Sequence, residues 1–207
     1  MSATTYHYPQ KMGRIILLGV EEVIGKAGLD AVLRLGTLEE AVRTSQTSSN
    51  DRTFSFETVS QIHQSLEIAY GPKGGRGLAL RAGRECFKYG LKEYGSLLGL
   101  TEMAFRLLPL PAKLRVGANS FAGLFNHQTD QVVRIEETDS TIYWHIERCP
   151  LCWERTSEDP VCHLAMGLLQ EGLYWLSGGR IFNVEETACR ARGDERCTFA
   201  IEKTPLT

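Results

Sequence analysis

The sequence lacks long hydrophobic runs, since its apolar stretches reach only six residues, as at residues 15–20. A helix that spans a bilayer needs about 20 such residues. The first ten residues, MSATTYHYPQ, also lack the charged-then-apolar order of a signal peptide. We therefore expect a protein without a transmembrane segment that resides in the cytoplasm.

Excess charge of either sign is absent as well. Lys and Arg number 23 against 25 Asp and Glu, which gives a net charge of -2 and predicts no general attraction to nucleic acid or anionic membranes. Hydrophobic residues make up 43% and charged residues 23%, close to the average of globular proteins. This composition excludes a disordered, collagen-like or coiled-coil chain, and 207 residues fit one large domain or two small ones.

Familiar catalytic motifs are missing too. The chain has no G-x-S-x-G, no H-E-x-x-H and no dinucleotide-binding glycine fingerprint. The glycine-rich stretch at residues 71–77, GPKGGRG, does not fit a P-loop because Lys73 is followed by glycine instead of Ser or Thr. We interpret this stretch as a turn between helices. Because no catalytic motif is present, we expect a binding protein rather than an enzyme.

The hydrophobic pattern changes along the chain. Apolar residues recur at helical spacing over residues 14–43, with a turn near Gly25 and Gly28, over 56–69, over a long segment after 77, and over a pair of helices between 101 and 126. After residue 130 the period becomes two, with one hairpin at 131–148, a helix at 161–176 and a second hairpin around Gly193-Asp194. This order predicts an α+β fold, with an N-terminal helical region and an antiparallel sheet of four or more strands against which helices pack.

The six cysteines are unevenly placed, because five of them lie in the C-terminal third. In a reducing compartment such clustering indicates metal or redox chemistry. Cys189 and Cys197 flank a turn symmetrically and are expected to be cross-strand neighbours that bind one ion. Cys162, at a helix start, and either Glu185 or Glu186 would complete a closed Cys3Glu zinc site, which is typical of a structural role.

The choice between the two glutamates depends on strand geometry. Glu186 and Cys189 are an odd number of residues apart, so on an ideal strand they face opposite sides. A ligand role for Glu186 requires a bulge or a strand end near Thr187. Glu185 has the matching parity and is the alternative ligand.

Cys149 and Cys152 form a separate C-x-x-C pair directly after a predicted strand. Three interpretations remain open for it: a second metal site with Cys162 and His163, an iron-sulfur cluster that includes Cys162, or incidental thiols in a loop. Cys86 lies in the middle of a helix and is expected to fill the core or an interface.

The C-terminal pattern resembles a known family. It comprises Cys162, Gly172, Gly179, the stretch Val-Glu-Glu-Thr-Ala-Cys at 184–189, Gly193-Asp194, Cys197, Phe199 and Ile201. This pattern is similar to the signature of the 4-vinyl reductase domain, which occurs in a protein associated with bacteriochlorophyll synthesis, in the sensor domains of phenol- and xylene-responsive transcription activators, and in stand-alone binding proteins. The resemblance extends over most of the chain, but only residues 162–207 are specific.

The resemblance implies several properties. Matched residue by residue, the metal ligands of the sensors fall on Cys162, Glu186, Cys189 and Cys197. Residues 1–55 would form an N-terminal helical region for packing or homodimerisation, and residues 56–207 a ligand-binding domain with the metal site, together one continuous domain. The ligand would be an aromatic molecule or a tetrapyrrole, in an apolar cavity between helices and sheet. Links to chlorophyll metabolism and to protein partners in photosynthetic assembly also follow from it.

Amphipathic aromatic side chains are the candidate cavity walls, and parity divides some of them. On the strand at 141–148, Tyr143 and His145 share one face while Trp144 lies on the other. We predict Trp144 in the core and His145 near the ligand, and His127 is a candidate axial ligand for a tetrapyrrole metal. The predicted ligand-binding residues are Phe121, Phe125, Tyr143, His145, Tyr174 and Trp175.

Three functions remain in competition. The first is a zinc-stabilised carrier, sensor or assembly factor for a hydrophobic ligand. The second is a reductase of a tetrapyrrole vinyl group, or another redox protein, with an iron-sulfur cluster on Cys149, Cys152 and Cys162. The third is an interaction subunit without an exchangeable ligand, because the family fold also resembles subunits of vesicle-tethering complexes.

Overall fold

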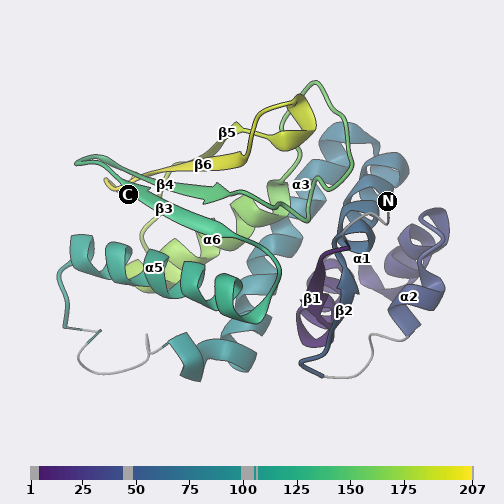
Figure 1. The fold of residues 1–207 in the computed structure, drawn as a ribbon, viewed down its shortest axis with the longest axis horizontal. Helices are drawn as coiled ribbons and strands as arrows, with labels where there is room; N and C mark the ends of the chain where they lie inside the picture. Colours follow the sequence, from purple (N-terminus) through teal and green to yellow (C-terminus); the bar gives the residue numbers. More distant parts are fainter. Residues whose placement is uncertain (1–4, 44–48, 99–104, 106, 207) are drawn as a thin grey trace.

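A four-stranded antiparallel sheet covers one side of a helical body in the computed structural model, which describes residues 5–43, 49–98, 105 and 107–206 (Figure 1). The strand order is β3-β4-β6-β5, from β3 (Val133–Glu137), β4 (Thr141–Ile146), β6 (Cys197–Glu202) and β5 (Val184–Ala188). Both predicted hairpins are present, and the predicted α+β class is confirmed.

The inner face of this sheet is apolar. Ile142 pairs with Ile201 and Trp144 pairs with Phe199, and all four side chains are buried. Because side chains alternate along each strand, the intervening residues face outward. The sheet therefore contributes to the hydrophobic core from one face.

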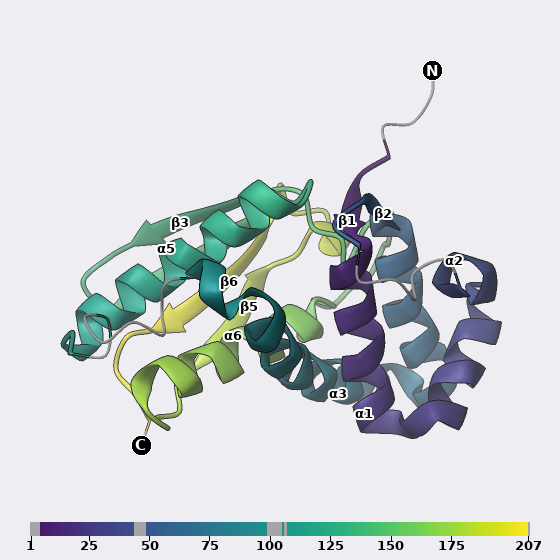
Figure 2. The same cartoon turned by 90° about the horizontal axis from the view of Figure 1, so that it is seen from below.

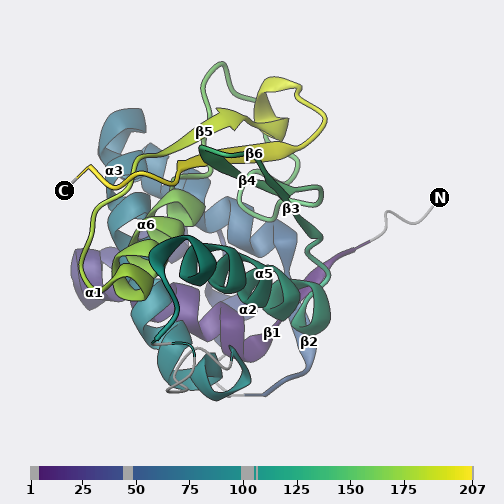
Figure 3. The same cartoon turned by 90° about the vertical axis from the view of Figure 1, so that its left-hand side faces the viewer.

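Helices form the layers beneath this face. α5 (Leu110–Gln128) lies against β3 and α6 (His163–Ser177) against β5, as the view from below shows (Figure 2). α3 (Phe56–Leu98) crosses α6 on the side away from the sheet, and α1 (Gln10–Leu35) packs along α3 (Figure 3). α2 (Glu39–Arg43) is a short helix after α1. The part of the chain that the structure describes contains no helix long and apolar enough to cross a membrane.

The two expected turns are kinks at single glycines. α1 continues through Gly28 and leaves helical geometry only at Gly25, with φ 72° and ψ 165°. Two helical segments of α3 likewise meet at Gly71, with φ 73° and ψ 158°, so the predicted break is present but residues 72–77 are helical and not part of a turn. Pro72 suits the first position of the second segment because it has no N–H to leave unpaired.

Two short strands that were not predicted from the sequence form a small second sheet. β1 (His7–Pro9) pairs antiparallel with β2 (Arg52–Ser55), and strands this short give no measurable period of two. The polar stretch TSQTSSNDRT at residues 44–53 lies partly outside the described residues. Of the helix pair expected between 101 and 126, the second is α5, which begins after Pro109, whereas the first falls largely outside the described residues.

Gly71 provides a test of the kink in α3. Its φ and ψ lie in a region that is nearly exclusive to glycine, where another residue costs about 1–3 kcal/mol. Gly71→Ala is therefore expected to lower the free energy of unfolding by about that amount in urea titrations. Gly74→Ala, in the helical segment that follows, should be neutral or slightly stabilising. Equal effects of the two changes would show that the kink is not the source of the cost.

Candidate metal centre and apolar cavity

Five thiols and one carboxylate meet in the interior where the sheet adjoins the start of α6. Their positions follow from the local structure: two lie in the turn after β4, one caps α6, and three come from β5, its end and the start of β6. All six side chains are buried. They belong to Cys149, Cys152, Cys162, Glu186, Cys189 and Cys197.

The sulfur separations match those of thiolates that share a metal ion. The Sγ of Cys162 lies 3.5 Å from that of Cys149, 3.7 Å from that of Cys197 and 3.9 Å from that of Cys189. Zinc-sulfur bonds of about 2.3 Å in a tetrahedron place the sulfurs about 3.8 Å apart. All of these distances exceed a disulfide bond of about 2.05 Å, and the six cysteines are free thiols. The cluster could therefore hold a metal ion.

Glu186 enters the cluster because β5 is irregular. The register shifts between Glu186 and Ala188, which is the bulge that a ligand role for Glu186 requires. Its Oε2 accepts a hydrogen bond of 2.9 Å from the backbone N–H of Cys162, while Oε1 is buried without a partner among the described residues. Burial and the neighbouring Cys189 raise the pKa of this carboxyl to about 9. Glu185, the alternative ligand, is exposed on the outer face.

The structure joins the two predicted cysteine groups into one. Cys149 and Cys152 form a set with Cys162 and Cys197, and these last two also belong to the predicted set with Glu186 and Cys189. Within each set all donor atoms lie within 4.8 Å of one another. His163, expected to accompany the first pair, belongs to neither set, and its buried Nδ1 has no partner among the described residues. Cys86 lies apart on α3, where its thiol contacts the carbonyl of Ile15.

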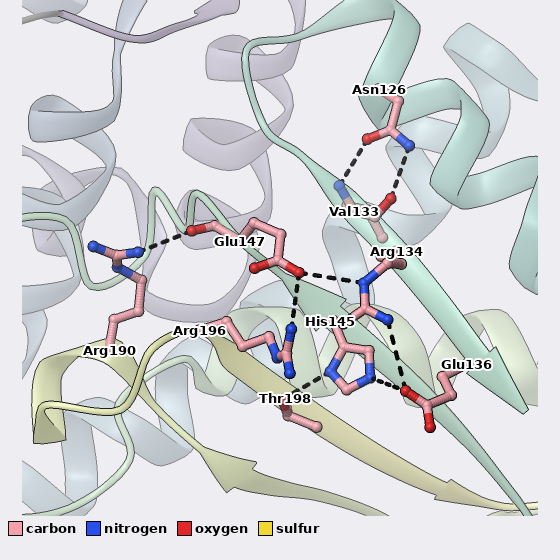
Figure 4. A network of polar contacts seen from close by, with 9 residues as sticks. All are labelled: Asn126, Val133, Arg134, Glu136, His145, Glu147, Arg190, Arg196 and Thr198. Carbon is pink, nitrogen blue, oxygen red and sulfur yellow. Dashed lines mark hydrogen bonds and ion pairs between the residues drawn. The ribbon is translucent and has the colours of Figure 1, made fainter.

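A polar network on the outer face holds the segments that carry the cluster together (Figure 4). The guanidinium of Arg190 donates to the backbone carbonyls of Glu147, at 3.0 Å, and Glu195, at 3.1 Å. The carboxylate of Glu147 in turn pairs with Arg134 at 3.4 Å and Arg196 at 3.3 Å. The turn that carries Cys149 and Cys152 is thus attached to the β5–β6 connection.

Tyr143 and His145 belong to this outer face as well. Nδ1 of His145 is 3.0 Å from the hydroxyl of Thr198, and Nε2 is 3.5 Å from the carboxylate of Glu136. Tyr143 stacks on the imidazole with ring centres 6.1 Å apart. Desolvation and the nearby Arg134 and Arg196 lower the pKa of His145. Both residues therefore lie across the sheet from the buried Trp144, not beside a ligand in the interior.

An apolar cavity of about 90 Å³ lies beneath the sheet. Phe121 and Phe125, two of the predicted ligand residues, line it, whereas Tyr174 is 48% exposed and Trp175 packs against Phe87 with ring centres 6.2 Å apart. Its walls come from β1, α1, α3, α5, β4, α6 and two connecting segments, through Tyr8, Met12, Ile15, Ile16, Cys86, Phe87, Gly90, Tyr94, Leu98, Phe121, Leu124, Phe125, Gln131, Trp144, Ile146, Leu151, Leu164, Ala165, Leu168 and Leu169. A second hollow of about 30 Å³ adjoins it and shares Phe87, Phe121 and Trp144.

Polar groups are few in the cavity wall, and one is unpaired. The hydroxyl of Tyr8 donates to the Gln131 side chain, but the hydroxyl of Tyr94 is buried without a partner among the described residues. Burial and nearby Glu93 raise the pKa of Tyr94 to about 12, so the hydroxyl stays neutral and available as a donor. Tyr94 is not among the residues predicted from the sequence, although its spacing from Phe87 places both on one face of a helix.

The metal cluster and the cavity share a wall. Leu151, which lies between Cys149 and Cys152, lines the cavity, as does Ile146, which pairs with Cys197. Leu164 lines it two residues after Cys162. A metal ion that fixes the cysteines would therefore also fix this end of the cavity.

Comparison with known proteins agrees with the C-terminal pattern. Residues 142–203 match the model of the 4-vinyl reductase domain, and this segment contains all six donors. An uncharacterized protein of Methanocaldococcus jannaschii is 35% identical over 57 residues, which cover 28% of this chain and 31% of that protein. The match therefore spans about a third of the relative's length.

Solved structures resemble the fold over nearly the whole chain. An H-NOX protein from K. algicida, in the Fe(II) unliganded state, has a TM-score of 0.58 at 18% identity, over 96% of this chain and 98% of that one. An H-NOX protein mutant from S. oneidensis, in the Fe(II) ligation state, has a TM-score of 0.60 at 11% identity, over 96% of each chain. At these identities the likeness shows the fold alone.

Proposed function

Because residues 142–203 of this chain match the 4-vinyl reductase domain, we propose that the protein is a metal-stabilised carrier, sensor or assembly factor that binds a small, mainly apolar molecule. The observation that carries the proposal is the cavity of about 90 Å³, whose wall includes Tyr94, a residue with a buried hydroxyl that has no partner among the described residues. Binding sites for small molecules are mainly apolar, with a few polar groups that orient the ligand.

Zinc is the metal that the donor set supports. Thiolates with one carboxylate suit a closed, four-coordinate structural site at Cys162, Glu186, Cys189 and Cys197. Oε1 of Glu186, unpaired among the described residues, would gain a partner, which removes the cost of burying it alone. Sulfurs 3.4–3.9 Å apart suit thiolates that share a metal ion. They support zinc over a [4Fe–4S] cluster, in which each thiolate binds a separate iron around an inorganic core.

The cavity favours a single-ring ligand over a tetrapyrrole. An engineered cavity of about 150 Å³ binds benzene, so even one ring requires some widening of this one, for example into the hollow beside Phe87. Heme is named for one of the similar H-NOX structures, but a tetrapyrrole does not fit a cavity smaller than the one that binds a single benzene ring, and His127 is exposed. A link to chlorophyll metabolism therefore stays a proposal that the family resemblance alone supports.

A pair of probes tests the role of Tyr94. Phenol and toluene have similar size, but only phenol offers an oxygen to the tyrosine hydroxyl. One hydrogen bond contributes about 0.5–1.5 kcal/mol, so we expect phenol to bind roughly two- to tenfold more tightly than toluene in calorimetric titrations. Tyr94→Phe should abolish this preference and leave toluene binding nearly unchanged.

Tyr174→Phe is the matched control, because Tyr174 is exposed and does not line the cavity. It should preserve the preference for phenol. Absence of binding by both probes, combined with tight stoichiometric binding of added heme, would replace this proposal with that of a tetrapyrrole carrier. Absence of binding by all three would favour the interaction subunit.

The proposed setting is a homodimer in the cytoplasm. The free thiols of the cluster are consistent with a reducing compartment. Dimerisation follows only from the resemblance to sensors, since Gly19 of the N-terminal helix contacts Cys86 of α3 within one chain. Sedimentation equilibrium would decide the oligomeric state.

A further inference from the structure

We propose that the cluster binds two metal ions, bridged by the thiolates of Cys162 and Cys197. The proposal extends the single zinc site described above and rests on it. The first ion is the one held with Glu186 and Cys189. The second is completed by Cys149 and Cys152, which lie outside the ligand pattern that the resemblance implies.

Donor counting supports this arrangement. Two tetrahedral ions that share one edge need six donor atoms, since two common ligands each occupy a position on both ions. The cluster offers six donors in two sets of four, and the sets have two thiols in common. Neither set requires a ligand from solvent or from another chain.

The distances between sulfurs agree with shared ligands. Cys162 and Cys197, the two bridges, have sulfurs 3.7 Å apart. Each bridge also contacts one sulfur of the C-x-x-C pair: Cys149 is 3.5 Å from Cys162, and Cys152 is 3.4 Å from Cys197. The C-x-x-C thiols thus divide evenly between the same two sulfurs that also belong to the first site.

The C-x-x-C segment is anchored beside the other ligands. Two cysteines separated by two residues are a common ligand pair for one zinc ion. Here a turn follows Cys152 directly, in which Glu154 has a positive φ of 56° and the N–H of Arg155 donates to the carbonyl of Cys152 at 3.1 Å. Arg190 binds the carbonyl of Glu147 just before this turn, so the turn is held against the remaining ligands.

The charge count is compatible with two ions. When all six donors bind as five thiolates and a carboxylate, two divalent ions leave a net charge of -2 on the cluster. The backbone N–H of Arg190, 3.4 Å from the Cys197 sulfur, is directed at that charge. A single ion at the first site would instead leave Cys149 and Cys152 without a metal. That alternative predicts a different metal content.

Metal analysis of the full chain, purified without oxygen and equilibrated with zinc, tests the proposal. We expect two zinc ions per chain in the wild type and one in Cys149→Ser/Cys152→Ser, with unchanged far-UV circular dichroism. Cys86→Ala, which removes a buried thiol outside the cluster, should retain two. After exchange into cadmium-113, the wild type should give two NMR resonances and the double variant one.

The outcomes separate the two proposals. One ion per chain in both the wild type and the double variant would overturn the second site and leave the first. No zinc in the wild type, or iron with inorganic sulfide, would overturn both. Should the double variant fail to fold, the number of cadmium resonances in the wild type decides by itself.

Discussion

Replacing Cys162 by serine is expected to cause the largest loss of stability of any single cluster substitution. Its sulfur lies within 4 Å of three other thiol sulfurs, and it belongs to both sets of donors. Structural zinc contributes about 10–16 kcal/mol to folding of zinc-finger peptides, whereas a whole domain is stable by about 5–15 kcal/mol. Cys162→Ser should therefore lose its metal and be largely unfolded by circular dichroism at 25 °C.

A chelator should reproduce this effect in the wild type. Prolonged dialysis against a strong chelator is expected to lower the melting temperature, and added zinc should restore it. Cys86→Ala is again the control, because Cys86 is buried like Cys162 but contacts no other thiol that the structure describes. A melting temperature of Cys162→Ser equal to that of Cys86→Ala would refute a metal-dependent fold.

The sequence revealed the C-terminal half of the molecule because its signals are local. Gly193 lies in the turn between Cys189 and Cys197, and it adopts a positive φ of 96°, which glycine tolerates best. The alternation in β4 placed Trp144 in the core correctly. Strand alternation also predicts that Glu186 and Cys189 face opposite sides of an ideal strand, and the bulge between Glu186 and Ala188 removes this conflict.

That five cysteines would lie in one cluster could not be predicted in the same way. Whether Cys149 and Cys152 join the other thiols depends on how the segment after β4 folds back onto β6. Residues 147–162 show no helical or strand pattern from which this fold could be predicted. The position of His145 was misjudged for a related reason. Strand alternation predicts which residues share a face of the sheet, but it does not predict which face lines the cavity. The imidazole of His145 has its polar partners, Thr198 and Glu136, on the outer face.

The cavity wall depends on contacts between distant helices, among them the close crossing of α3 and α6. The backbones meet at two glycines: a Cβ on Gly167 would lie 1.9 Å from the carbonyl oxygen of Leu80, and one on Gly83 would lie 2.1 Å from that of Leu164. Because both neighbours are backbone atoms, only separation of the helices would relieve the clash. Leu164 and Leu168 line the cavity, so separation would also deform it.

Gly83→Ala and Gly167→Ala are therefore expected to lower the free energy of unfolding by about 3 kcal/mol or more, at or beyond the upper end of overpacking costs. Urea titration measures this as a lower midpoint at an unchanged slope. Gly77→Ala, on α3 with open space around its Cβ, should instead stabilise by about 0.5–1 kcal/mol.

The Gly83 variant carries a second expectation, because Leu164 is two residues after the ligand Cys162. If the crossing positions the start of α6, Gly83→Ala should release zinc to a competing chelator faster than the wild type, while Gly77→Ala should not. A variant that loses stability yet retains zinc as firmly as the wild type would show that β5 and β6, and not α6, hold the metal centre in place.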